Sequence, residues 1–248
     1  MEVIYILWLR QLKKYLRSRS RMIGSLGQPV LFLFALGFGF GPVFERAGQG
    51  NYLAYLSPGI ISMSILFTSV FSGIEIIWDR QFGFLKETLV APVPRWQIML
   101  GRTLGGATVA SLQGLLVLII SLLAGFRPQI SLMLLLALFI IIITAVLFTA
   151  LGTAIASVLT DMQGFHLIMN FLIMPLFFLS GALFPLKNLP EILSLLIYLD
   201  PLTYSVDGLR ATLTGVSHFG LSFDLSVLII LSLVLTAVGS FLFSKIEI

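Results

Sequence analysis

Cysteine is absent from this sequence, and charged residues make up only 10% of its 248 positions. Without cysteine, the chain has no disulfide framework, no Cys-ligated metal site and no thiol nucleophile. Soluble domains normally carry about 25% charged residues, so the composition argues against an ordinary soluble protein. A phosphate-binding G-x-x-x-x-G-K-[ST] loop is also absent, which excludes ATP binding by that route.

Long apolar stretches dominate what is present, since 58% of the residues are hydrophobic. A spanning helix needs about 20 mostly apolar residues to cross about 30 Å of hydrocarbon. Six stretches reach this length and predict an all-α polytopic membrane protein, with residues 1–248 forming a single domain. The predicted spans are Met22–Val43, Tyr52–Ile77, Thr103–Ala124, Leu132–Leu159, His166–Pro185 and Leu225–Phe243.

The basic residues gather on one side of these spans. Eleven of the fifteen Lys and Arg residues lie in the N-terminal segment, the loop between spans two and three, or the C-terminus. Only Arg46, Arg127, Lys187 and Arg210 fall on the other side. Cytoplasmic loops carry an excess of Lys and Arg. The pattern therefore predicts a multi-pass protein of the cell (cytoplasmic) membrane with both termini in the cytoplasm, in contact with membrane lipids and not with nucleic acid.

The segment before span one, residues 1–21, carries six of the basic residues. Its apolar residues recur at helical spacing along one side, and they are Trp8, Leu9, Leu12, Tyr15 and Leu16. A basic amphipathic helix of this kind is typical of the membrane interface. The segment thus predicts an N-terminal interfacial helix, and the alternative is a plain basic tail that only sets the orientation.

Two loops are longer than the topology requires. The cytoplasmic loop, residues 78–102, contains a short apolar segment, Phe82–Val90, that ends before Pro92 and Pro94 and predicts a surface helix. The exterior loop, residues 186–224, contains Leu189–Leu199 and Thr203–Leu213, which are too short to span. We expect these two pieces to be interfacial or re-entrant half-helices between spans five and six.

Residues that could carry chemistry inside the membrane are scarce. Glu75 is the one ionisable candidate in a predicted span, and its position near the cytoplasmic end favours a salt-bridged or water-accessible carboxylate over a functional group. Ser180 and His166 are too far apart along a helix to act as a catalytic pair. The sequence therefore predicts no catalytic residue, no metal site and no enzyme activity of the chain itself.

Two stretches resemble a known family. The run from Arg80 through Phe82 and Lys86 to Val93 is similar to the first cytoplasmic loop of ABC-2 type exporter permeases. The stretch Pro175–Pro185, followed by Asp200–Tyr204 and Asp207–Arg210, resembles the same family around span five and the exterior loop. The similarity covers nearly the whole chain and is greatest to the short drug-, nodulation-factor- and daunorubicin-resistance-like branch.

The resemblance implies the transmembrane subunit of an ATP-driven exporter of amphipathic, drug-like or lipid-linked molecules. Such permeases dimerise, here as a homodimer, and pair with two copies of an ABC ATP-binding subunit that holds ATP and Mg²⁺. The resemblance also implies a coupling helix that docks on that subunit, formed by Phe82, Phe84, Leu85, Lys86, Glu87 and Leu89. The alternative function is a secondary carrier or channel driven by an ion gradient.

A substrate path and an exterior gate complete the expectations. Asn170, Met174, Phe177 and Gly181 recur at three- or four-residue steps in span five, so they share one helical face. By resemblance, spans two and five line the path and span one lies beside span five. The alternative is that this face packs in the core of the bundle and contacts no substrate. The expected exterior gate is formed by Asp200, Pro201 and Tyr204.

Overall fold

The computed structural model describes residues 2–48, 50–90, 92–129, 132–186 and 190–246. Within these ranges every regular element is an α-helix and no strand forms. The helices are α1 (Glu2–Arg17), α2 (Arg19–Arg46), α3 (Tyr52–Ser72), α4 (Ile74–Gln81), α5 (Phe84–Val90), α6 (Arg95–Leu123), α7 (Met133–Val158), α8 (Met162–Leu179), α9 (Glu191–Leu199), α10 (Pro201–Thr214) and α11 (Leu221–Ser244).

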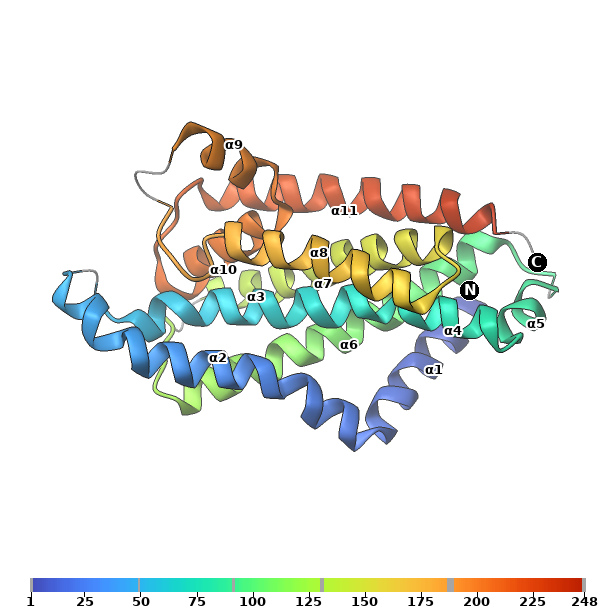
Figure 1. Ribbon diagram of the computed structural model, residues 1–248, viewed down its shortest axis with the longest axis horizontal. Helices are drawn as coiled ribbons and strands as arrows, with labels where there is room; N and C mark the ends of the chain where they lie inside the picture. The colour runs from blue at the N-terminus through green and yellow to red at the C-terminus, as the bar shows by residue number, and fades with distance from the viewer. Residues whose placement is uncertain (1, 49, 91, 130–131, 187–189, 247–248) are drawn as a thin grey trace.

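Six helical segments of the described chain are long and apolar enough to cross a membrane, which confirms the all-α polytopic prediction. They are α2, α3 with α4, α6, α7, α8 and α11. In Figure 1 these segments run along the long axis of one elongated bundle. Both chain ends and α5 lie at one end of the bundle, and α9 and α10 lie toward the other.

Local sequence signals explain several of the helix boundaries. The Asn51 side chain accepts hydrogen bonds from the backbone N–H groups of Leu53 and Ala54 and so begins α3. Asp161 does the same for α8 through the N–H of Gly164. Because of this cap, α8 begins four residues before the predicted span five. It ends at Leu179, and Gly181 then adopts φ +72°, so the stretch up to Pro185 is not helical as expected.

The N-terminal segment is helical, but it is shorter than residues 1–21 because Ser18 separates α1 from α2. Its aromatic side contacts protein. The Trp8 Nε1–H donates to Thr108 Oγ1 at 2.9 Å, and the buried Tyr15 hydroxyl donates to Gln113 Oε1 at 2.7 Å, both on α6. Two of the five predicted apolar residues therefore anchor α1 to the bundle.

Glycines on α6 permit this contact. A Cβ at Gly101 would lie 3.0 Å from Leu7 Cβ, and one at Gly105 would lie 2.7 Å from the Gln11 side chain. Small residues at four-residue spacing let two helices approach closely. The pair Gly101 and Gly105 thus positions α1 across α6, next to the loop between spans two and three.

The two predicted half-helices differ in environment. They meet at Asp200 with a bend of 83° between α9 and α10. Most of α9 is exposed, as expected for an interfacial piece, whereas α10 is buried against α3, α7 and α11 as a re-entrant helix is. Lys187 and Leu189, which belong to the predicted exterior loop, lie outside the described residues.

Candidate functional site

The short helix α5 forms a projection at the end of the bundle where both termini lie (Figure 1). It begins at Phe84, two residues later than expected, because Gly83 adopts φ +81° and turns the chain sharply after α4. Phe82 precedes that turn and is 79% exposed, and Val90 at the other end of α5 is 77% exposed. Together with Phe84, which is 43% exposed, these side chains form an exposed apolar surface outside the spans, and a contiguous surface of this kind is a candidate for an interaction.

The expected docking set needs one correction. Leu85 was expected to contact a partner, but it is 2% exposed and packs in the core of this chain. The side chains that α5 and its flanks present outward are Phe82, Phe84, Lys86 and Glu87, with Leu89 half-buried. Leu85 instead fixes α5 to the bundle. A displacement of the exposed side of α5 by a partner can therefore be transmitted to α4.

A cluster of charges connects α5 to three other helices. The Asp79 carboxylate of α4 accepts from Arg102 Nη2 of α6 at 2.6 Å and from Arg10 Nη2 of α1 at 3.3 Å. The Arg10 guanidinium also lies over the Phe84 ring, 4.2 Å from its centroid. Arg10 therefore contacts α4 and α5 together, and such a cation–π contact adds about 0.5–1 kcal/mol at an exposed site. We call Arg10, Asp79, Arg102 and Phe84 the charged clamp.

Glu75 and Arg80 extend the contacts around the clamp. Lys14 Nζ of α1 lies 3.3 Å from Glu75 Oε1, which confirms the salt-bridged interpretation of this carboxylate. Arg80 donates to the carbonyl oxygens of Ser157 and Leu159, at 3.0 Å each, at the C-terminal end of α7. A cation at a helix C-terminus neutralises its exposed carbonyls. The segment α4 is thus joined to α1, α6 and α7 at one level of the bundle.

The opposite end is held through backbone atoms. Arg210 of α10 is buried, lies 4.0 Å over the Tyr55 ring and donates from Nη2 to the Gly181 carbonyl at 3.0 Å. The Tyr55 hydroxyl donates to the same carbonyl at 2.8 Å, and the Tyr52 hydroxyl donates to the Leu183 carbonyl at 3.2 Å. These bonds fix the turn after α8 against α3 and α10, and we call them the carbonyl anchor.

The expected gate residues act mainly as structural groups within the protomer. The Asp200 side chain accepts from the Leu202 N–H at 2.8 Å and caps α10, whose first residue is Pro201. The Tyr204 hydroxyl donates to the Tyr198 carbonyl at 2.7 Å, which holds α9 to α10. All three lie at the bend between the half-helices, where a movement of α9 against α10 would be centred.

Two further carboxylates are buried beside α10. Asp207 accepts from the backbone N–H groups of His218 and Phe219, at 2.8 Å each, and so shapes the turn from α10 to α11. Asp224 in the first turn of α11 is fully buried, and neither of its carboxylate oxygens has a hydrogen-bond partner in the part of the chain that the structure describes. Among the described residues no group of three or more His, Cys, Asp or Glu side chains is arranged to hold a metal ion.

The predicted face of span five does not share one environment. Asn170 and Met174 are exposed on the surface of the protomer, whereas Phe177 is 1% exposed and Gly181 is buried. Phe177 makes an edge contact with Phe32 of α2, with ring centroids 6.1 Å apart. Phe177 is therefore core within the protomer, which is the alternative given for this face, and the placement of span one beside span five stays a prediction supported by this one contact. Asn170 and Met174 stay candidates for a path formed with a second copy.

The sequence did not predict the residues of the charged clamp or of the carbonyl anchor, which hold the helices together at each end of the bundle. In the sequence, Arg10 and Arg102 count only toward the orientation, Arg210 counts toward the orientation and the family resemblance, and no pattern singles out Asp79. Charges embedded in apolar helical stretches are costly unless they are paired. That cost is the signal by which Arg102 and Arg210 could have been singled out.

Comparison with known proteins gives one family and consistent relatives. The family model described as ABC-2 type transporter matches residues 2–214. Nodulation protein J of Rhizobium leguminosarum bv. viciae is 31% identical over 198 residues, which cover 79% of this chain and 76% of that protein. A putative transport permease, ycf38, of Cyanophora paradoxa is 27% identical over 259 residues and covers 98% of this chain and 88% of the relative. The ycf38 protein of Porphyra purpurea is 30% identical over 200 residues, covering 78% and 68%.

Proposed function

The chain belongs to the ABC-2 type transporter family, and from this premise we propose that it is the transmembrane permease subunit of an ATP-driven exporter. It moves an amphipathic, drug-like or lipid-linked molecule outward across the cytoplasmic membrane. It works as a homodimer with two copies of an ABC ATP-binding subunit, which supply the ATP and Mg²⁺ sites. The absence of a phosphate-binding loop in this sequence is consistent with ATP binding on a separate subunit.

The observation that carries the proposal is the exposed apolar surface of α5 and its flanks. The helix α5 lies at one end of the bundle (Figure 1), and Phe82, Phe84 and Val90 are exposed there, outside the predicted spans. Burial of one such side chain against a partner stabilises a complex by about 1.5–3 kcal/mol. Lys86 and Glu87 add a polar rim around this apolar centre, which is the usual composition of a protein interface.

The charged clamp supports a route from that surface into the membrane. A displacement of α5 acts on Arg10 through Phe84 and on α4 through the buried Leu85. Because α4 continues α3 after the break at Gly73, the displacement reaches a spanning helix directly. We propose that ATP-driven movement of the partner shifts span two by this route.

The docking proposal is tested by making the same change, Val to Asp, at one position in each end of the bundle. Val90→Asp places a charge in the proposed apolar interface, and Val216→Asp places the same charge on a comparably exposed residue of the exterior turn. We expect Val90→Asp, and more strongly Phe82→Asp with Phe84→Asp, to lower co-purification of the ATP-binding subunit and substrate-stimulated ATPase activity at least tenfold. Val216→Asp should change neither. Full complex formation by the α5 variants would reject the docking surface.

One observation favours the rival class, a carrier driven by an ion gradient. Asp224 is a buried carboxylate beside Asp207 whose oxygens accept no hydrogen bond from a described donor, as in a proton- or cation-binding group of a carrier. Under the exporter proposal, Asp224→Asn should leave transport within about twofold of the wild type, since ATP supplies the energy. Loss of transport in Asp224→Asn, together with abolition by an uncoupler in the presence of ATP, would favour the carrier.

A further inference from the structure

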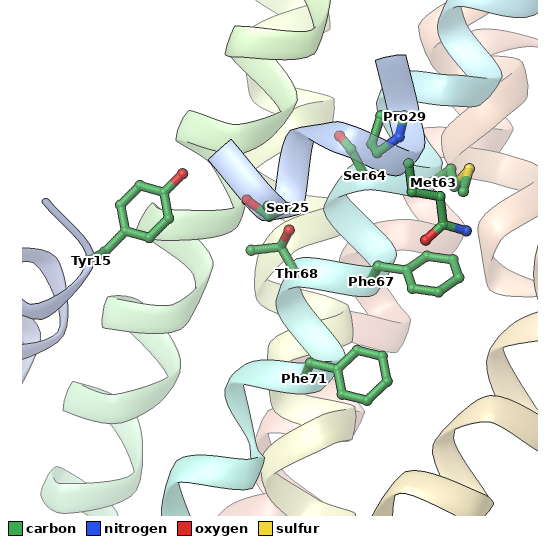
Figure 2. Close-up of a pocket in the computed structure, with 10 residues that line it drawn as sticks. Tyr15, Ser25, Pro29, Met63, Ser64, Phe67, Thr68 and Phe71 are labelled. Carbon is green, nitrogen blue, oxygen red and sulfur yellow. The ribbon is translucent and has the colours of Figure 1, made fainter. Parts of the chain in front are cut away.

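A pocket of about 230 Å³ lies between α2 and α3, in the half of the bundle nearer the charged clamp. Figure 2 shows Ser25 and Pro29 of α2 on one side of it, and Ser64, Thr68 and Phe71 of α3 on the other. Both helices are spanning segments, and Tyr15 of α1 also lines the pocket, so it lies where the N-terminal helix meets spans one and two. No residue of the expected span-five face lines it.

The lining is polar without being charged. No Asp, Glu, Lys or Arg belongs to it among the described residues. Gln28 is exposed within span one, and its amide makes no hydrogen bond with the described chain. The Thr68 hydroxyl likewise has no bond there, whereas Thr144, Thr153 and Thr212 each make one. An amide and a hydroxyl left unsatisfied at membrane depth are costly.

Pro29 removes the usual donor of one further acceptor. Proline has no backbone N–H, so within α2 the carbonyl oxygen of Ser25 lacks the donor that residue 29 would otherwise provide. Ser25 lines the same pocket. The pocket thus offers a carbonyl acceptor, a hydroxyl and an amide, beside the apolar surface of Phe67 and Phe71.

We propose that this pocket binds the uncharged, hydrogen-bonding head of an amphipathic cargo, one that carries hydroxyl or amide groups rather than a phosphate. The neutral lining selects against a charged head, because a charge there would be desolvated without a counter-charge. The basic residues Lys13, Arg17 and Arg19 would attract an anionic head instead, and they line a different concavity along α1. That the bound molecule is then exported rests on the proposed function. That it binds in this pocket does not.

Binding is tested with a photoreactive alkyl glucoside on the full chain in lipid nanodiscs, with crosslinks mapped by mass spectrometry. We expect crosslinks in segments 24–29 and 63–71, and competition by octyl glucoside but not by octyl phosphate. Loss of one neutral hydrogen bond weakens binding by roughly three- to tenfold. Thr68→Val and Gln28→Leu should each lower crosslinking in that range.

Two glycines of α2 give a matched pair. Gly24 lines the pocket and Gly27 does not, while a Cβ added at either meets no atom within 4 Å. Gly24→Leu should therefore fill the pocket and lower crosslinking at least tenfold, and Gly27→Leu should leave it unchanged. Equal crosslinking in both variants, or equal competition by octyl phosphate, would overturn the proposal.

Two other outcomes separate this inference from the export function. A second permease copy seated over α2 and α3 would exclude the probe and move every crosslink elsewhere, which would also overturn the pocket. Intact, glucoside-competed crosslinking in a protein that shows no ATP-dependent transport would support the pocket and count against the exporter. The binding site and the energy source are thus judged by different readouts.

Discussion

The two ends of this bundle are held together by different kinds of contact. At the end with both termini, the charged clamp joins separate helices through side chains; Arg10 is partly exposed to solvent, whereas the pair of Arg102 with Asp79 is buried. At the opposite end, the carbonyl anchor uses side chains to hold backbone atoms of a turn whose Gly181 has φ +72°. A side-chain ion pair in contact with water, such as that of Arg10, can re-form in a new position at little cost. Buried bonds to a fixed backbone cannot, so we interpret the contacts of Arg10 as the adjustable part of the first end and the carbonyl anchor as rigid.

The largest effect is expected from breaking the carbonyl anchor. Arg210→Ala removes the Nη2 bond to the Gly181 carbonyl and the stacking on Tyr55 and leaves a buried cavity. We expect a loss of about 3–5 kcal/mol of stability, seen as a much lower thermal unfolding temperature in detergent. Tyr55→Phe, which removes one hydroxyl bond, should cost about 1 kcal/mol. Similar unfolding temperatures for both variants would refute the interpretation that the carbonyl anchor makes its end of the bundle rigid.

An intermediate effect is expected from the charged clamp, and it should fall on coupling more than on folding. Asp79→Asn weakens contacts to Arg10 and to the buried Arg102 together, whereas Arg10→Gln breaks only the partly exposed pair and the contact with Phe84. We expect Arg10→Gln to change stability by less than about 1 kcal/mol. Asp79→Asn should cost more, because Arg102 is left buried.

The measurement for both clamp variants is ATPase activity of the complex with and without transported substrate. Substrate stimulation should fall severalfold in each variant while the basal rate persists, since docking through α5 is retained. Unchanged stimulation in Arg10→Gln would remove Arg10 from the coupling route. Loss of the whole complex in Asp79→Asn would show that the clamp maintains the fold rather than the coupling.

The smallest perturbation decides which end faces the cytoplasm. The chain has no cysteine, so single cysteines can be introduced at Glu191 or Ser217, near the carbonyl anchor, and at Gln97, near the charged clamp. We expect an impermeant thiol reagent to label the first two from outside intact cells and to leave Gln97→Cys unlabelled until the membrane is opened. Export activity should stay unchanged in all three. External labelling at Gln97→Cys would invert the predicted orientation.

The helix α5 shows where sequence reasoning stopped. Its existence and its end at Val90 followed from a short apolar stretch before two prolines, and the structure confirms them. The inward face did not follow, because Phe84, Leu85 and Leu89 are all apolar and periodicity does not tell which of them packs in this chain and which is presented to a partner. The turn at Gly83, with φ +81°, sets the direction of α5 after α4, and Leu85 then packs in the core.

In span five, too, the sequence predicted a helix but not which of its faces is buried. Asn170, Met174 and Phe177 do recur at helical spacing, yet lipid and protein interior are both apolar, so periodicity alone does not say which side faces which. The buried stripe of α8 is Phe165, Met169, Ile173 and Phe177, and only the contact with Phe32 and the neighbouring spans selects it.

The sequence by itself determined the membrane class, the six spans, the short helix before the prolines and the half-helices around Asp200, because length, hydropathy and proline act locally. Tertiary structure alone decided that Arg10 reaches Asp79, 69 residues away, and that Arg210 reaches Gly181. It also decided that Gln28 and Thr68 share a pocket. Pairings of this kind depend on which helices become neighbours, and in a bundle whose helices are nearly all apolar, packing shape and a few costly polar groups settle that choice.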